Sequence, residues 1–223
     1  MKLYSHPASP NCVAVLMTAA QLDLALEIEF VDLLGGAQRS PAFRAINPNG
    51  LVPSLVDDSF VLWETQAIIQ YLAATVPDTP LWPNNARSRA DIARWQFWAV
   101  AHWMPALRPF LYENVFKALK GEGGPDPAVL ENAEAAFDAP AHVLDSCLGD
   151  RSFAVGEGMT LADIALASYL MYAQPARVPL QQYPRIRGWL DSIERMPSWQ
   201  KATARATSLF EAASVRLAPQ VMA

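Results

Sequence analysis

The chain has 223 residues, of which 52% are apolar and 17% are charged, so it can bury a sizeable core in one or two domains. A formal net charge of −5 gives no electrostatic footprint for a nucleic acid or an anionic membrane surface. The two cysteines, Cys12 and Cys147, form no disulfide framework and are typical of a reducing compartment. No stretch approaches the roughly 18 apolar residues of a membrane span, and the N-terminus lacks the apolar region of a signal peptide. We therefore expect a cytoplasmic protein.

The first third of the chain alternates short strands with helices. Ser9 and Pro10 are typical of an N-cap and a first helical position, so a helix is expected to begin there. Asn47-Pro48-Asn49-Gly50 is a strong turn signal. The predicted elements are a strand over 2–5, a helix over 9–22, a strand over 26–31, a hairpin of strands over 54–56 and 60–62, and a helix over 64–75. This order is that of a thioredoxin-like unit.

An all-helical region is expected to follow a proline-rich linker. Three prolines fall between Val76 and Pro83, and the strand signals stop beyond them. Pro105 and Pro109 should kink or interrupt the first of the helices that follow. These helices are predicted over 88–119, 127–148, 161–173, 186–195 and 198–213. The domains are therefore expected over 1–77 and 88–223, with a linker over 78–87.

A capping box is predicted at the start of the third of these helices. In Thr160-Leu161-Ala162-Asp163, Thr160 would cap the helix and Asp163 would take the place of the usual Glu. Met159 and Ile164 stand where a hydrophobic staple would lie. We interpret the motif as local helix nucleation.

Two nearby motifs predict a site that holds a short peptide. Pro53 stands between two apolar runs, and because proline cannot donate within a strand ladder, it indicates a turn just before a strand. Val52 would then be extended, with its N–H and C=O free to pair with a bound molecule. Glu64 and Thr65 open an apolar helix whose free N–H groups attract a carboxylate.

In order and spacing, these motifs together resemble those of the cytosolic glutathione transferases. The opening His6-Pro7-Ala8-Ser9 looks most like the bacterial, serine-dependent phi and theta-like members. The resemblance spans nearly the whole chain. It implies an α/β thioredoxin-like N-terminal domain plus an all-α C-terminal domain, assembly as a homodimer, and glutathione as co-substrate without a metal.

The resemblance also implies roles for individual residues. The bond before Pro53 would be cis, and the backbone of Val52 would pair with the cysteinyl unit of glutathione. Leu51 departs from the phi pattern, in which a Gln commonly precedes the Val and supplies a contact.

The two ends of glutathione would be bound by different segments. The resemblance implies that Glu64 faces the γ-glutamyl ammonium group, while the Thr65 hydroxyl and the N–H groups of the helix start receive its carboxylate. Gln38 and Arg39 fall where related enzymes contact the glycyl carboxylate, although ordinary loop polarity explains these two side chains as well.

Glutathione must react as a thiolate, whereas a free thiol has a pKa of about 8.5. Lowering that pKa by two units requires about 2.7 kcal/mol of stabilisation of the anion. Ser9 stands at the positive end of the first helix, and its hydroxyl can donate to sulfur while its oxygen caps the helix. Asn11 is the rival donor, through its amide. Cys12 is interpreted as a small buried hydrophobe.

The resemblance places an electrophile between the domains, against an aromatic-rich helix. By register we expect Arg108, Tyr112 and Phe116 to line its site, and we interpret His102 as structural. No His/Cys/Asp cluster indicates a metal. The predicted function is glutathione transfer to a small apolar electrophile. The alternatives are a specialised glutathione-dependent dehalogenase, isomerase or reductase, and a non-catalytic binding or interaction module.

Overall fold

The computed structural model describes residues 1–217, except for the side chains of Leu119 and residues 208–217, so the last six residues of the predicted helical domain lie outside it. Within the described part, one mixed sheet has the strand order β2-β1-β3-β4. The strands are β1 (Lys2–Ser5), β2 (Glu27–Phe30), β3 (Ser54–Asp57) and β4 (Phe60–Trp63). β1 is parallel to β2 and antiparallel to β3, which also pairs with β4. The predicted strands and the thioredoxin-like unit are confirmed.

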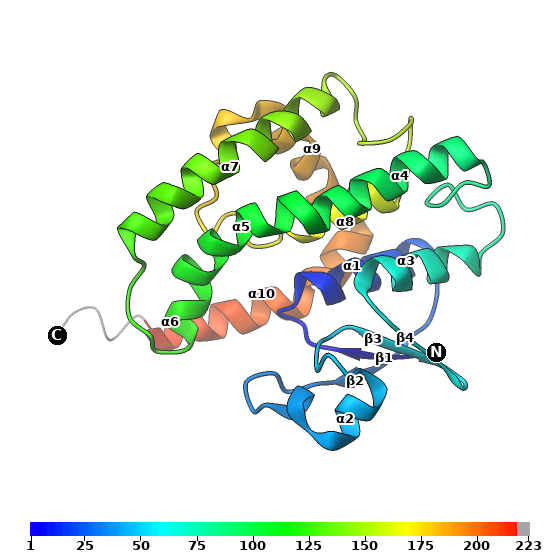
Figure 1. Ribbon diagram of the computed structural model, residues 1–223, viewed down its shortest axis with the longest axis horizontal. Helices are drawn as coiled ribbons and strands as arrows, with labels where there is room; N and C mark the ends of the chain where they lie inside the picture. The colour runs from blue at the N-terminus through cyan, green and yellow to red at the C-terminus, as the bar shows by residue number, and fades with distance from the viewer. Residues whose placement is uncertain (218–223) are drawn as a thin grey trace.

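Helices lie on both faces of this sheet (Figure 1). α1 (Pro10–Gln21) and α3 (Thr65–Ala74) lie on the face toward the other helices, whereas α2 (Pro41–Ile46) lies on the opposite face. The parallel pairing of β1 with β2 requires a crossover, which α1 provides.

Helix α2 was not predicted, although the sequence contains its signal. Ser40 caps it by accepting a hydrogen bond from the N–H of Phe43 at 3.2 Å, and Pro41 follows at the first helical position. This is the Ser-Pro signature that predicted α1 from Ser9. A 3₁₀ turn over Ala37–Arg39 precedes α2.

One helical run extends from Ala86 to Leu119. It comprises α4 (Ala86–Trp98), a π-helical segment (Ala99–Trp103), α5 (Met104–Leu111), a second π-helical segment (Tyr112–Phe116) and α6 (Lys117–Leu119). Two π-helical turns rather than a break therefore interrupt the run, and Pro109 itself lies inside α5. The first of these contains residue 101, whose carbonyl would meet the ring of Pro105 in a regular helix.

The remaining helices follow the predicted order. They are α7 (Pro127–Leu148), α8 (Leu161–Ser168), α9 (Pro184–Glu194) and α10 (Pro197–Leu217), with a 3₁₀ turn over Leu180–Gln182. The expectation that α8 continues to residue 173 is wrong. After Ser168 the chain tightens into shorter turns, in which Leu170 N–H donates to the carbonyl of Ala167 at 2.8 Å. None of the described helices is both long enough and apolar enough to traverse a lipid bilayer.

A continuous apolar core joins the sheet to the helical region. α1 lies in its middle, in contact with α3, α8 and α10. Val13, Val15 and Met17 are completely buried. A smaller cluster on the α2 side contains Cys12, Phe43 and Val52. The prediction that Cys12 is a buried hydrophobe is confirmed.

The predicted capping box is present and belongs to a larger buried network. Asp163, which has no exposed surface, accepts hydrogen bonds from the N–H and hydroxyl of Thr160 at 2.9 and 3.2 Å. It also accepts from the N–H of Ala154 at 2.7 Å and from Nε1 of Trp189 at 3.0 Å. Asp163 therefore ties the start of α8 to α9 as well as capping it.

Asp163→Asn should lower the free energy of unfolding by about 3 kcal/mol, because an amide NH₂ would then face donors that now bind a carboxylate. Urea unfolding followed by tryptophan fluorescence measures this loss. As a control, Asp150→Asn changes an exposed carboxylate and should alter the free energy by less than about 0.5 kcal/mol. Similar losses in both variants would contradict the assigned role of the network.

Candidate functional site

The turn between β1 and α1 is fixed by its own hydrogen bonds. The N–H of Ser9 donates to the carbonyl of His6 at 3.0 Å, and the N–H of Ala8 donates to Nδ1 of the same histidine at 3.1 Å. The Ser9 oxygen accepts from the N–H of Cys12 at 3.4 Å, which confirms the predicted N-cap. A hydroxyl oxygen that accepts at a helix cap can still donate its hydrogen, and Ser9 stands at the positive end of α1.

The Val52–Pro53 peptide bond is cis, as the resemblance implies. Within the described residues, neither the N–H nor the C=O of Val52 forms a hydrogen bond, so both are available to a ligand. Asn47 holds in place the loop over residues 51–53, which we call the Val-Pro loop. Its Nδ2 donates to the carbonyl of Leu51 at 2.7 Å and to the hydroxyl of Ser54 at 3.1 Å. The sequence indicates the turn at Asn47 but not this anchoring function.

The start of α3 combines an unusual backbone with free donors. Glu64 has φ 74° and ψ 118°, a region that costs a non-glycine residue about 1–3 kcal/mol. Its side chain makes no capping bond, so the first N–H groups of the helix have no partner from that side chain. Thr65 is the first helical residue and is buried. This end of α3 is suited to an anion.

These segments meet at one small polar pocket of about 60 Å³. Its lining residues are Asn11, Asn47, Asn49, Leu51, Val52, Pro53, Glu64 and Thr65. The structure thus brings Asn11 together with the predicted glutathione-binding residues of the Val-Pro loop and α3. Ser9 does not line the pocket and lies two positions earlier, at the N-cap. A larger cavity of about 410 Å³, bounded by α1, β2 and α10, contains none of the predicted site residues.

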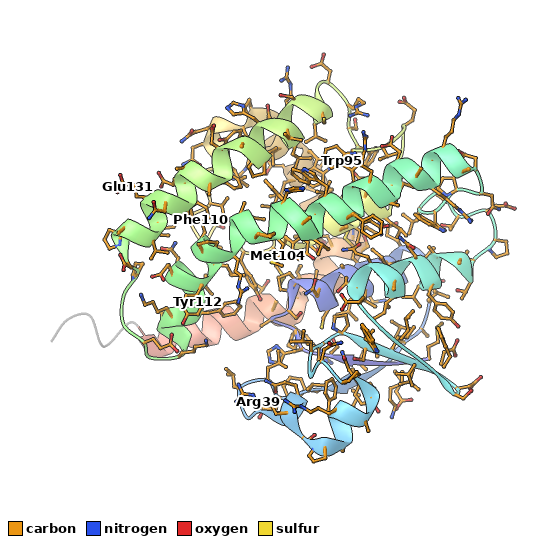
Figure 2. The ribbon with its side chains drawn as sticks, viewed as in Figure 1. Arg39, Trp95, Met104, Phe110, Tyr112 and Glu131 are labelled. Atoms are coloured by element: carbon orange, nitrogen blue, oxygen red, sulfur yellow. The ribbon has the colours of Figure 1, made fainter. Side chains whose placement is uncertain are left out.

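Gln38 and Arg39 lie on the α2 side of the sheet. The side-chain amide of Gln38 donates to the carbonyl of Leu33 at 3.2 Å. The backbone carbonyl of Gln38 approaches Gly50, where a Cβ would lie 2.9 Å from that oxygen, and φ at Gly50 is +64°, so glycine is required. Gln38 therefore lies against the Val-Pro loop. Arg39 is exposed beside α2 (Figure 2).

Of the three residues expected at the electrophile site, Arg108 and Tyr112 are exposed and Phe116 is half-buried. Tyr112 lies near the end of the long helical run (Figure 2), and its hydroxyl donates to Glu122 at 2.6 Å. Neither Arg108 nor Tyr112 lines the polar pocket. Phe116 packs edge-on against Tyr172, with ring centres 6.4 Å apart. Tyr172 in turn approaches the β1–α1 turn.

Two tyrosines of the turn after α8 bind the β1–α1 turn directly. The hydroxyl of Tyr169 donates to Oδ1 of Asn11 at 3.1 Å, and that of Tyr172 donates to the carbonyl of Ala8 at 2.9 Å. Burial raises the pKa of Tyr169 to about 12 and also raises that of Tyr172, so both remain donors at neutral pH. No local signal in the sequence links these tyrosines to a turn more than 150 positions earlier. Among the described residues, no three His, Cys, Asp or Glu side chains cluster as metal ligands.

The conformation of the β1–α1 turn should depend on pH through His6. Burial lowers the pKa of His6, and its Nδ1 must be unprotonated to accept from Ala8. The stabilisation from this pKa shift is therefore complete above the unfolded pKa of about 6.5 and is lost as pH falls through the folded-state value. In His6→Asn, an amide oxygen replaces this acceptor and does not titrate. Wild type should therefore lose unfolding free energy relative to the variant as the pH falls from about 8 to 5. A difference independent of pH would contradict the assignment.

Comparisons with known proteins agree with this geometry. Two family models match the chain: the N-terminal domain of glutathione S-transferases over residues 3–80 and the C-terminal domain over residues 127–192. Glutathione S-transferase 3 of Zea mays is 34% identical over 209 residues, which cover 92% of this chain and 93% of that protein.

Solved structures are similar over almost the full chain. Glutathione transferase F7 from Populus trichocarpa aligns with a TM-score of 0.84 at 25% identity, covering 91% of this chain and 97% of its own. A glutathione S-transferase-I structure bound with lactoylglutathione aligns with a TM-score of 0.82 at 25% identity, covering 91% and 98% of the two chains. The chain belongs to the glutathione S-transferase family.

Proposed function

We propose that the chain is a glutathione transferase, which forms the glutathione thiolate and directs it at a small apolar electrophile. The observation that supports this most is the convergence of Val52, Glu64 and Asn11 on one polar pocket beside the N-terminus of α1. Membership of the family supports the same activity.

The pocket offers complementary groups along the length of glutathione. The free N–H and C=O of Val52 would pair with the cysteinyl unit in the manner of an added strand. The γ-glutamyl carboxylate would bind at Thr65 and the start of α3, and its ammonium group would face Glu64. Gln38 and Arg39 are proposed for the glycyl carboxylate, on the support of the position of Gln38 against the Val-Pro loop. In this arrangement, neutral or cationic protein groups face the two carboxylates of glutathione, and the anionic side chain of Glu64 faces its amine.

Ionisation of the thiol is assigned to Ser9 and Asn11 together. A hydrogen bond to a charged group contributes about 1.5–3 kcal/mol, and a helix N-terminus adds about 0.3–1 kcal/mol. One such donor combined with α1 therefore approaches the 2.7 kcal/mol or so needed to lower the thiol pKa by two units. A second donor makes the stabilisation sufficient without relying on the upper limit of either value.

In the transfer step, the thiolate sulfur forms a bond to an electrophilic carbon, and the electron pair of the broken bond leaves with the departing group or moves into the conjugated acceptor. We assign the electrophile side to Arg108, Tyr112 and Phe116. The contact of Phe116 with Tyr172, which binds the β1–α1 turn, supports the role of Phe116 in particular.

The proposal extends to the class and setting of the enzyme. Ser9 at the start of α1 supports a serine-dependent, phi or theta-like class. A bacterial source and a cytoplasmic location are predictions from the sequence. For the homodimer, the support is a set of exposed apolar side chains on the edge strand β4 and the α4 region, namely Phe60, Val61, Trp63, Phe97 and Val100.

Titrating the protein with glutathione at neutral pH should produce the near-ultraviolet absorbance of a thiolate. Ser9→Ala should abolish most of that absorbance and lower kcat/KM by about 100-fold, because it removes a donor to the reacting anion. Asn85→Ala is the matched control, since Asn85 caps α4 through the N–H of Ser88 and lies outside the proposed site. Tight glutathione binding by wild type without any thiolate absorbance would favour a non-catalytic binding module instead.

Phe97→Glu should convert the proposed dimer to monomers, because Phe97 is 70% exposed in the single chain and a buried carboxylate would oppose association. Sedimentation velocity at micromolar concentration measures the change. Val129→Glu alters a comparably apolar side chain on α7 and should leave the dimer intact. A monomeric wild type at these concentrations would refute the homodimer.

A further inference from the structure

The side chain of Asn11 is held by Tyr169, which stands 158 positions later in the helical region. The only described hydrogen bond of this side chain is the one that Oδ1 accepts from the hydroxyl of Tyr169 at 3.1 Å. The Nδ2 group of Asn11 has no partner among the described residues. An amide in this state has its acceptor occupied and both of its donor hydrogens free.

The fixed acceptor determines where the donors point. Oδ1 and Nδ2 diverge from one planar group, so an oxygen held toward Tyr169 leaves the nitrogen directed to another side. Asn11 lines the polar pocket together with Val52, whose backbone is proposed to pair with the cysteinyl unit of glutathione. The sulfur of that unit is therefore the anion within reach of Nδ2.

We propose that Tyr169 is a positioning residue for glutathione activation, whose hydroxyl fixes the amide of Asn11 so that Nδ2 donates to the glutathione thiolate. This inference rests on the proposed function, because it presupposes that glutathione occupies the pocket. Without the Tyr169 hydroxyl, the Asn11 amide can turn over and present Oδ1 to the sulfur. An oxygen facing a thiolate disfavours the anion, whereas an N–H favours it.

The surroundings of Tyr169 suit this role. Its side chain is buried, and burial raises its pKa to about 12, so it donates throughout the range in which the enzyme would act. It stands in the turn directly after α8, whose start is fixed by the Asp163 network. The neighbouring bond from Tyr172 to Ala8 holds the same β1–α1 turn at a second point. A residue of the helical region thereby orients the side-chain amide of Asn11, which belongs to α1 of the thioredoxin-like unit.

The test is the apparent pKa of the bound glutathione thiol, followed through thiolate absorbance, in Tyr169→Phe and wild type. We expect the pKa to rise by about one unit in the variant, which reduces the thiolate fraction about tenfold at pH values well below the wild-type pKa and progressively less above it. The kcat should fall accordingly near neutral pH and recover as the pH is raised, while KM for glutathione changes little. A purely structural function would lower stability without moving this pH profile.

Tyr183→Phe provides the matched control. Tyr183 is also buried, and its hydroxyl donates to Asp138 at 2.8 Å, away from the pocket. This variant should leave the thiol pKa unchanged. Thermal unfolding of both variants separates any general loss of stability from the effect on ionisation.

Substitutions of Asn11 complete the test. If Tyr169 acts through Asn11, then Tyr169→Phe should have no further effect on the thiol pKa in an Asn11→Ala background. Asn11→Asp keeps an acceptor for Tyr169 but loses the donor, so it should raise the thiol pKa at least as much as Asn11→Ala.

Each contrary result has a distinct meaning. An equal shift from Tyr169→Phe with and without Asn11, or no shift at all, would overturn the inference while leaving glutathione transfer intact. If the thiol pKa in Asn11→Ala stayed at the wild-type value, the inference would also be overturned, and Ser9 would remain as the donor. Absence of thiolate in wild type would overturn the proposed function and this inference with it.

Discussion

The burial of helix α1 is the constraint on which the rest of the structure depends. α1 contacts α3 on the sheet side and α8 and α10 in the helical region, and Val13, Val15 and Met17 have no exposed surface. A helix packed on all these sides cannot rotate or slide without opening voids in a close-packed core. Its N-terminus, with Ser9 and Asn11, is therefore fixed relative to both parts of the chain. A donor that must meet a sulfur atom to within a fraction of an ångström requires such a support.

Further contacts fix the groups that face this helix end. Asn47, almost completely buried, fixes the Val-Pro loop, and the remaining fold sustains the positive φ of Glu64. Asp163 joins α8 to α9, so the turn after α8 can place Tyr169 against Asn11. The pocket is thus organised before any ligand binds, and the conformational entropy of its residues is lost during folding and not on binding. The capping box predicted as a local nucleation signal has this longer-range consequence.

The parts of the fold that could be predicted are those with a local physical signature. Ser9-Pro10 indicated a helix start, and the proline after Val52 indicated a turn with a free backbone, because each depends on neighbouring residues alone. Ser40-Pro41 has the same signature but stands within a polar loop. The bond between Tyr169 and Asn11 joins residues 158 positions apart, so no window of sequence could reveal it.

The proposed electrophile side is the part of the site that the sequence specifies least, and the long helical run gives a physical reason. Arg108, Tyr112 and Phe116 were placed by counting along a regular helix. The run instead contains two π-helical segments, over Ala99–Trp103 and Tyr112–Phe116. Each extra residue in such a turn rotates all that follows by about 100° relative to a regular α-helix. A face assigned by 3.6-residue periodicity therefore shifts at each of the two segments, so the periodicity alone does not determine which side chains of the run share a face. The proposed glutathione side uses backbone groups and helix ends, which do not depend on that periodicity, so the sequence specifies the co-substrate far better than the electrophile.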